Sequence, residues 1–500
     1  MSSLPARRLW ERSIALWIVI LLGTALRLVD LDRPVAQRTP STWHESDYVQ
    51  IARAFLREDP NPLRPRVDWR GTTTGEVEVE LPVLPWLAAM LYRVLGYDES
   101  ILRWLAAACS VASLVVFLRL THRVLEPPAA LLATAAFAVH PLPLALASSM
   151  QPEPLQVLLM CAAGLAIERW HREGGTARLC MASSWVGAAV LAKGPAAHLG
   201  LLLAFLVLRR KGWRAVLDLR VLGAAGFALI PAVAWYGWAH ALYLETGLSM
   251  GLSNETHFLS TTMLEHPGWM KSLIRIEARD VFAYGALPLV ACAALAPFRR
   301  LEPIAAWYGA VVVFYVVAAD TCADAWSFYY HVNSVVPACL LLGLGFTALR
   351  ERAAGWARTL AWVLALTALG SVGLQTVRMH IGMQPDIRLE ALRRACLELS
   401  AAIPPDALIV VRGGERFDPH GHPLAYNESM AFAWMDRKGW NYAIDDLSLA
   451  ELQRLARAGG RFWLAQPEDL RDPEFRDAVA RSFRRVKSSG GFELFDLRGR

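Results

Sequence analysis

The stretch that decides the fold is ILRWLAAACSVASLVVFLRL, residues 101–120, whose charged side chains stand only at positions 103 and 119. A helix that crosses a bilayer needs about 20 mostly uncharged residues, because each residue advances it by 1.5 Å. The 500-residue chain holds eleven runs of this kind, so we predict a polytopic α-helical membrane protein with about 11 spanning helices. The candidate spans are 13–30, 100–120, 128–147, 150–168, 179–193, 195–208, 220–243, 281–298, 303–319, 329–349 and 357–376.

Basic residues in the short connections predict how these helices are oriented. Alternate connections are rich in arginine and lysine, whereas the turns near 148–150 and 320–327 contain neither. Cytoplasmic loops carry such an excess, so the N-terminus is predicted to be cytoplasmic and, after eleven spans, the C-terminus extracytoplasmic. Residues 381–500 hold 18 basic and 18 acidic side chains, so the net charge of +6 belongs to residues 1–380 and indicates no nucleic-acid partner.

Three segments are predicted to lie outside the membrane, all on the outer side. The first is the loop 31–99, which ends in a short apolar stretch at 82–96 that we expect to form an interfacial helix. The second is the loop 244–280. The third is the tail 381–500, which follows the transmembrane domain 1–380 and in which the apolar residues recur with a different period.

The tail reads as a small α/β domain. Short β-type runs are expected as strands, and alternation of strand and helix predicts some parallel pairing. The segment 447–460 is expected as a helix, with Ser448 as its N-cap and Glu451 completing a capping box. The expected strands are 407–413, 441–444, 461–465 and 492–496.

The first outer loop contains TWHESDYVQIARAF, residues 42–55. Its apolar residues recur with helical spacing, which predicts an amphipathic helix beginning near Thr42. Thr42 and Glu45 match a capping box, so both a capping and a catalytic role are open for Glu45. Asp47 lies beside the apolar stripe and is the better candidate for a general base, the alternative being an acid that faces the helix dipole.

The same loop contains GEVEVELP, residues 75–82, in which Glu76, Glu78 and Glu80 alternate with apolar residues. This period predicts a strand with one acidic face. For Glu76 and Glu78, a solvated edge strand is as good an explanation as a role in a functional site. Glu80 is the stronger functional candidate, because it adjoins the expected interfacial helix.

Unusual polar residues also stand at the predicted outer ends of the helices. Glu153 and Lys193 are placed there, with snorkelling as the alternative for the lysine, and so are Tyr329 and Tyr330, with an aromatic belt as the alternative. Arg275 and Arg279 lie in the second outer loop. Acids and cations on one side suit sugar transfer from an anionic lipid, because a carboxylate takes a proton and cations hold phosphate. The seven cysteines show no metal-ligand spacing, and no metal or cofactor is expected.

The ordered set of motifs resembles a known family. The acid-bearing motif after the first helix, Glu80-Leu81-Pro82, Pro152-Glu153, Lys193-Gly194-Pro195 and Tyr329-Tyr330 are similar to those of the dolichyl-phosphate-mannose–protein mannosyltransferase-like glycosyltransferases of family 39, related to lipid A aminoarabinose transferases. The resemblance implies a GT-C fold, a polyprenyl-phosphate sugar donor, inversion, and an outer-loop aspartate as base, which matches Asp47. Many relatives have Asp-Glu where His44-Glu45 stands here, which would make Glu45 the base. The tail motif DRKGW, residues 436–440, also resembles those of bacterial members.

We therefore expect a glycosyltransferase of a bacterial inner membrane that acts on its outer face. Asp47 or Glu45 would be the base, and the tail would be periplasmic. The acceptor would be a protein, lipid or glycan hydroxyl. A transporter or flippase, and a lipid-sugar-binding protein without activity, are the alternatives. The residues expected to bind substrate are His44, Tyr48, Glu80, Glu153, Lys193, Arg275, Arg279, Tyr329 and Tyr330.

Overall fold

The computed structural model describes residues 14–37, 42–255, 268–323, 325–352, 354–383, 387–417, 421 and 423–499. Positions 256–267 of the predicted second outer loop lie outside this set. The chain forms two compact units, and the first outer loop shares its unit with the tail. Unit 1 comprises Met1–Leu31, Arg103–Trp235 and His257–Gly382, and unit 2 comprises Asp32–Leu102, Tyr236–Thr256 and Met383–Arg500.

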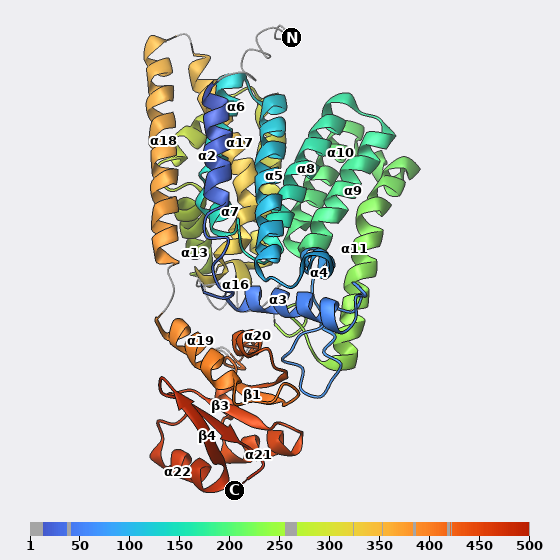
Figure 1. The fold of residues 1–500 in the computed structure, drawn as a ribbon. Coiled ribbons are helices and arrows are strands. Elements are labelled where there is room, and N and C mark those ends of the chain that lie inside the picture. Colours follow the sequence, from blue (N-terminus) through green and yellow to red (C-terminus); the bar gives the residue numbers. More distant parts are fainter. Residues whose placement is uncertain are drawn as a thin grey trace. The chain divides into compact units, whose positions relative to one another are not determined.

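Unit 1 is helical, and Figure 1 shows its long helices running alongside one another. Among the helices that the structure describes, five are long and apolar enough to cross a membrane: α5, α11, α15, α17 with the turn before it, and α18. The helices of this unit, of which α5 and α11 extend into the other, are α2 (Ile14–Arg27), α5 (Ser100–Val124), α6 (Pro127–Ala138), α7 (Pro141–Ala145), α8 (Glu153–Glu173), α9 (Thr176–Ala192), α10 (His198–Lys211), α11 (Leu219–Thr246), α13 (Trp269–Ile276), α14 (Leu287–Ala291), α15 (Phe298–Val317), α16 (Ala319–Cys322), α17 (Val332–Arg350) and α18 (Gly355–Gly382).

The predicted spans are helical, but two of them are broken, and the count of eleven stays a prediction. The span 128–147 divides into α6 and α7, because His140 precedes a proline and adopts an extended conformation. The span 281–298 contains only α14 and the 3-10 turn Cys292–Leu295. Ala283 and Tyr284, with φ of 46° and 57°, separate α14 from the preceding π-helical turn.

Helix α17 is the central element of unit 1. All of its side chains from Val332 to Leu349 are buried, and it packs against α6, α14, α15 and α18. A Cβ atom on Gly345 would lie 1.9 Å from the Leu289 carbonyl oxygen of α14. Glycine at this position therefore lets two helix backbones touch, which fixes the short α14 against the core.

Unit 2 combines the first outer loop with the tail. The segment 82–96 forms a helix as predicted, α4, and the segment with Asp47 forms α3. The elements are α3 (Thr42–Arg57), α4 (Val83–Leu95), α19 (Ile387–Ser400), β1 (Ile409–Arg412), α20 (Met430–Met435), β2 (Gly439–Tyr442), α21 (Leu449–Arg457), β3 (Phe462–Ala465), α22 (Pro473–Ser482), β4 (Arg484–Ser489) and β5 (Phe492–Asp496).

The tail carries a five-stranded mixed sheet of order β2-β1-β3-β5-β4. The predicted parallel pairing is confirmed, since β1 runs parallel to both β2 and β3, whereas β5 is antiparallel to β3 and β4. The Ser448 cap is confirmed too, because its hydroxyl accepts from the Glu451 amide at 3.2 Å. The sequence missed β4, an edge strand whose side chains are mostly exposed and therefore lack apolar alternation.

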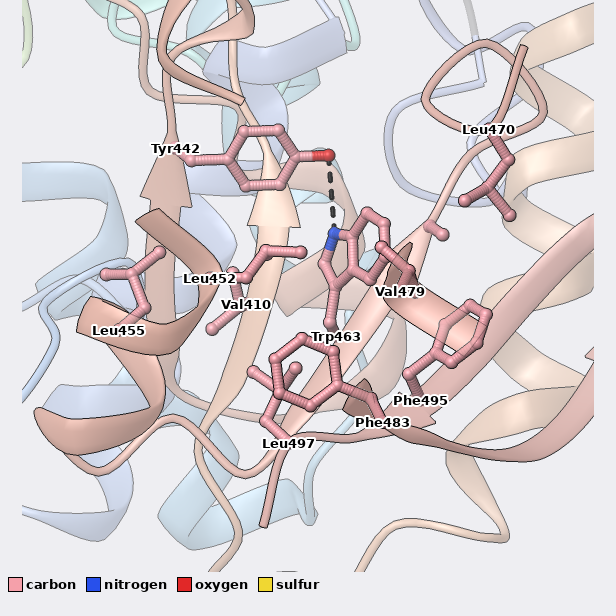
Figure 2. Close-up of a cluster of buried hydrophobic side chains, with 11 residues drawn as sticks. Val410, Tyr442, Leu452, Leu455, Trp463, Leu470, Val479, Phe483, Phe495 and Leu497 are labelled. Atoms are coloured by element: carbon pink, nitrogen blue, oxygen red, sulfur yellow. Dashed lines mark hydrogen bonds between the residues drawn. The ribbon is translucent and has the colours of Figure 1, made fainter. Parts of the chain in front are cut away.

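One face of this sheet holds the core of the tail (Figure 2). Trp463 of β3 is fully buried between Val410 of β1 and Phe495 of β5, and α21 and α22 contribute Leu452, Leu455 and Val479. The indole N–H of Trp463 donates to the Tyr442 hydroxyl at 3.4 Å, so a buried polar group is satisfied. This core holds β1 and β2 in place, and the site described next depends on the segments around β2.

Candidate active site

Asp47 is the most unusual acid of unit 2. It lies on α3 with no exposed surface. The indole N–H of Trp69 donates to its Oδ1 at 2.8 Å, and its Oδ2 is buried with no hydrogen-bond partner among the described residues. Burial raises its pKa to about 8, against the lowering effect of hydrogen bonding from the Trp69 and Ser429 side chains, and the nearby carboxyls of Glu428 and Asp68 raise it further.

Two further buried acids surround Asp47. Burial raises the pKa of Asp68 to about 7 and that of Glu428 to about 7. Gln50, one turn after Asp47, connects α3 to the two segments that carry these acids. Its Nε2 donates to the Ser429 carbonyl at 2.8 Å, and its Oε1 accepts from the Asp68 amide at 2.9 Å. The sequence did not single out Asp68, Glu428 or Ser429, and the last two stand some 380 positions further along the chain.

Glu45 occupies a different environment from Asp47. Its carboxylate accepts from the Arg33 guanidinium at 3.0 Å and from the Ala36 amide at 3.2 Å. The Thr42 side chain is outside the described residues, so the capping box stays a prediction. Each of the two Glu45 carboxylate oxygens therefore already accepts a hydrogen bond, one of them from a cation. His44 is buried and its ring lies between those of Trp43 and Tyr48.

The predicted strand GEVEVELP is wrong, because only the isolated bridges Arg66↔Glu76 and Glu78↔Ser249 form there. Its acids are buried, so the solvated edge is wrong as well. Glu76 binds two arginines, and Glu78 accepts from two serine hydroxyls. Glu80 accepts from the Tyr48 hydroxyl at 3.0 Å, so the structure brings these two predicted site residues together.

The tail motif DRKGW holds the tail against the first outer loop. Asp436 accepts from Arg57 of α3 at 2.8 Å, and Lys438 pairs with Glu58 at 2.8 Å. The Gly439 amide donates to the Asp68 carbonyl at 2.9 Å, and the Gly439 carbonyl accepts from the Gly71 amide at 2.6 Å. The motif therefore positions the loop that carries Asp68 and, one residue further, Trp69, the hydrogen-bond donor of Asp47.

A second group of predicted residues comes together in unit 1. Lys193, at the C-cap of α9, pairs with Glu153 at the start of α8, and both are buried. The Lys193 ammonium also lies over the rings of Tyr329 and Tyr330, at 4.9 Å and 5.5 Å. The opposite charge of Glu153 and the two aromatic faces offset part of the cost of burying the Lys193 ammonium. Glu153 Oε2 has no hydrogen-bond partner among the described residues.

The two arginines of the second outer loop differ from each other. Arg279, in the π-helical turn Glu277–Val281, makes a bidentate pair with Asp280 at 2.7 and 2.9 Å, so its charge is balanced. Arg275 on α13 is exposed and has no acidic partner among the described residues. Of the two, Arg275 is the cation free to take an external anion.

The sequence also missed a buried pair that fixes the tyrosine segment. His331 Nδ1 lies 2.6 Å from Glu277 Oε1, and His331 Nε2 lies 2.9 Å from the Cys322 carbonyl oxygen. Both ring nitrogens therefore have an oxygen within hydrogen-bond distance. Ser334 donates to the same carboxylate at 2.7 Å. The turn Ala325–His331, which carries Tyr329 and Tyr330, is thereby tied to the π-helical turn.

The described residues contain no group of three His, Cys, Asp or Glu arranged to hold a metal ion. The arrangement offers instead two sets of organic groups. Unit 2 provides an acid with a raised pKa and one unengaged oxygen. Unit 1 provides a lysine between two tyrosine rings and an exposed arginine.

The apolar helices and the small mixed sheet, together with the solved structures described below, define the class, a multi-pass membrane protein of the GT-C fold. Residues 80–238 match the family described as "Dolichyl-phosphate-mannose-protein mannosyltransferase", which confirms the family resemblance predicted from the motifs. No significant match was found among curated protein sequences.

Solved structures share the fold over nearly the whole chain. ArnT from Cupriavidus metallidurans bound to undecaprenyl phosphate is 14% identical, with a TM-score of 0.59 over 97% of this chain and 98% of that one. The archaeal oligosaccharyltransferase AglB from Archaeoglobus fulgidus, in complex with an inhibitory peptide and a dolichol-phosphate, is 13% identical, with a TM-score of 0.57 over 97% and 74%. The arabinofuranosyltransferase AftD from Mycobacteria is 13% identical, with a TM-score of 0.53 over 96% and 41%.

Proposed function

We propose that this chain is a membrane glycosyltransferase that moves a sugar from a polyprenyl phosphate to an acceptor hydroxyl, with inversion, at the outer face of a bacterial inner membrane. The observation that carries the proposal is Asp47, an enclosed acid with a pKa of about 8 and an unengaged Oδ2. It lies on a fold shared over its whole length with ArnT bound to undecaprenyl phosphate. A general base works best when its pKa is near the operating pH.

Asp47 is the better candidate for the base than Glu45. Glu45 already accepts from Arg33 and Ala36, so it would have to break a salt bridge before taking a proton. Asp47 Oδ2 has no such partner to give up. Because Asp47 has no exposed surface, the acceptor reaches it only after the side chains that cover it move.

In the proposed reaction, Asp47 Oδ2 takes the acceptor O–H proton as the acceptor oxygen bonds to the anomeric carbon. The bond from that carbon to the phosphate oxygen breaks, and its electron pair leaves with the polyprenyl phosphate. Lys193 and the exposed Arg275 would neutralise this leaving group. Glu153 and Tyr330 would orient the sugar through Lys193, which both of them contact.

A second candidate is a lipid-sugar-binding protein without activity. The observation that favours it is His44, which stands where relatives carry the first acid of Asp-Glu and which is buried between aromatic rings. In this alternative the same groups would hold a donor without transferring its sugar.

The experiment that separates the two candidates uses membranes containing the full chain and a polyprenyl-phosphate pool with a radiolabelled sugar. The proposed function requires loss of label from the lipid fraction and its appearance in an acceptor. Retention of all label on the lipid, with donor co-purifying with the protein, supports the binding protein. Transfer of labelled lipid across the bilayer without loss of the sugar supports a flippase.

A further inference from the structure

The membrane-spanning part of unit 1 contains a groove that the proposed reaction does not use. It has a volume of about 770 Å³ and lies between α5, α8 and α9. Ligand pockets in proteins measure about 300–1,000 Å³, so the groove is large enough for a lipid segment. Within a bilayer such a volume is filled by an apolar molecule, because an empty groove would forfeit dispersion contacts along its walls.

The walls of the groove are apolar and open to the surroundings. Met181 is 57% exposed and Trp185 is 37% exposed, both on α9. On α8 the groove runs from Leu158 to Glu173. These two residues are separated by about 22 Å along the helix, so the groove follows more than half the thickness of a hydrocarbon core.

The arginine-rich end of the groove carries an excess of positive charge. Four arginines and one glutamate line it: Arg119, Arg123, Arg169, Arg178 and Glu173. Glu173 is shared, since it pairs with Arg123 at 2.8 Å and with Arg178 at 2.9 Å. Arg119 and Arg169 are exposed, and neither makes a salt bridge within the part of the chain that the structure describes, although Arg169 acts electrostatically on Glu173.

An excess of arginine near the cytoplasmic ends of helices is expected in a membrane protein, and Arg119 and Arg169 stand close to the C-terminal ends of α5 and α8. The additional observation is that both line one groove with apolar walls. Two exposed guanidinium groups that line an apolar groove are complementary to a phosphate that carries acyl chains. Guanidinium binds phosphate through two parallel hydrogen bonds.

We propose that this groove binds an anionic glycerophospholipid, with its phosphate between Arg119 and Arg169 and an acyl chain along α8 towards Leu158. The sequence predicts this end of the helices to be cytoplasmic, where anionic headgroups attract arginine. The site is independent of the proposed transfer reaction, whose groups all come from predicted outer segments.

The test is a lipid titration of the purified, delipidated full chain by native mass spectrometry, with phosphatidylglycerol and phosphatidylcholine as probes. The double variant Arg119→Gln/Arg169→Gln is expected to bind phosphatidylglycerol about thirtyfold more weakly, because each cation at the membrane surface contributes about fivefold. The control is Arg214→Gln/Arg220→Gln, two exposed arginines that do not line the groove, and it should keep the wild-type affinity.

A second measurement uses phosphatidylglycerol with brominated acyl chains, which quench nearby tryptophan. Wild type should lose more fluorescence than Trp185→Phe, since Trp185 lines the groove. The proposal is overturned if the groove variant keeps its affinity, if the control pair loses as much, or if phosphatidylcholine binds equally well. Preferential binding of polyprenyl phosphate over phosphatidylglycerol would also overturn it, and would assign the groove to the sugar carrier.

Discussion

The substitution Asp47→Asn should make unit 2 more stable at neutral and alkaline pH. The pKa of Asp47 is raised from 3.8 to about 8 in the folded protein. A raised pKa means that the folded state binds the proton more tightly than the unfolded state. The resulting stability is complete below about pH 4 and is lost as the pH rises towards 8.

The magnitude follows from the pKa shift. Each pH unit between the two pKa values changes the free energy of unfolding by about 1.36 kcal/mol. From pH 5 to pH 8 wild type should therefore lose about 4 kcal/mol through this residue. In a unit of about 200 residues, 1 kcal/mol corresponds to roughly 2–4 °C in Tm, so the loss amounts to about 8–16 °C. Asparagine is neutral throughout and removes this dependence.

The assay is thermal unfolding in detergent, followed by tryptophan fluorescence at pH 5 and pH 8. The two proteins should have similar Tm at pH 5, and Asp47→Asn should unfold at the higher temperature at pH 8. Asp477→Asn, an exposed acid on α22, is the matched control and should follow wild type. Equal pH dependence in wild type and Asp47→Asn would refute the assignment of a raised pKa to this buried acid.

Three further predictions concern the two sites. Lys193→Ala should destabilise unit 1 by about 3–5 kcal/mol, because it leaves the buried Glu153 carboxylate without its cation. Adding Glu153→Leu should recover most of this stability. Equal Tm in the single and the double variant would contradict the pairing. Transfer by wild type should rise almost tenfold per pH unit below pH 8 and level off above it, whereas a rate that falls over pH 6–8 would exclude Asp47 as base. Gly439→Ala should displace β2 from β1, because its Cβ would lie 1.7 Å from the Ile409 carbonyl oxygen, and so weaken the Gly439 hydrogen bonds to Asp68 and Gly71 of the first outer loop. Faster proteolysis between 60 and 75 is the expected readout, and unchanged proteolysis would count against the docking.

Features with local causes could be predicted from the sequence. Apolar runs gave the long helices, because spanning length is a property of contiguous residues. The α21 cap at Ser448 and the parallel strands around β1 likewise follow from patterns a few residues long. The position of Asp47 on a helix that buries it could be read from helical periodicity alone.

Features with distant causes could not be predicted. Glu78 looks like one member of a solvated acidic face, yet its hydrogen-bond partners are Ser249 and Ser253, more than 170 positions away. Glu428 and Ser429 carry no motif, and they come near Asp47 only because DRKGW and Gln50 tie the tail to α3. The hydrogen bond between His331 and Glu277 could not be predicted either, since Glu277 lies in a separate π-helical turn.

The most direct test of the central claim is sugar transfer from a radiolabelled polyprenyl-phosphate pool in membranes, measured for wild type, Asp47→Asn and Glu45→Gln at equal expression. The proposed mechanism predicts that Asp47→Asn lowers transfer by at least a hundredfold, the lower range for losing a general base. Glu45→Gln should keep most of it, because this residue is engaged by Arg33. Full transfer by Asp47→Asn, or its loss only in Glu45→Gln, would contradict the assignment of Asp47 as the base.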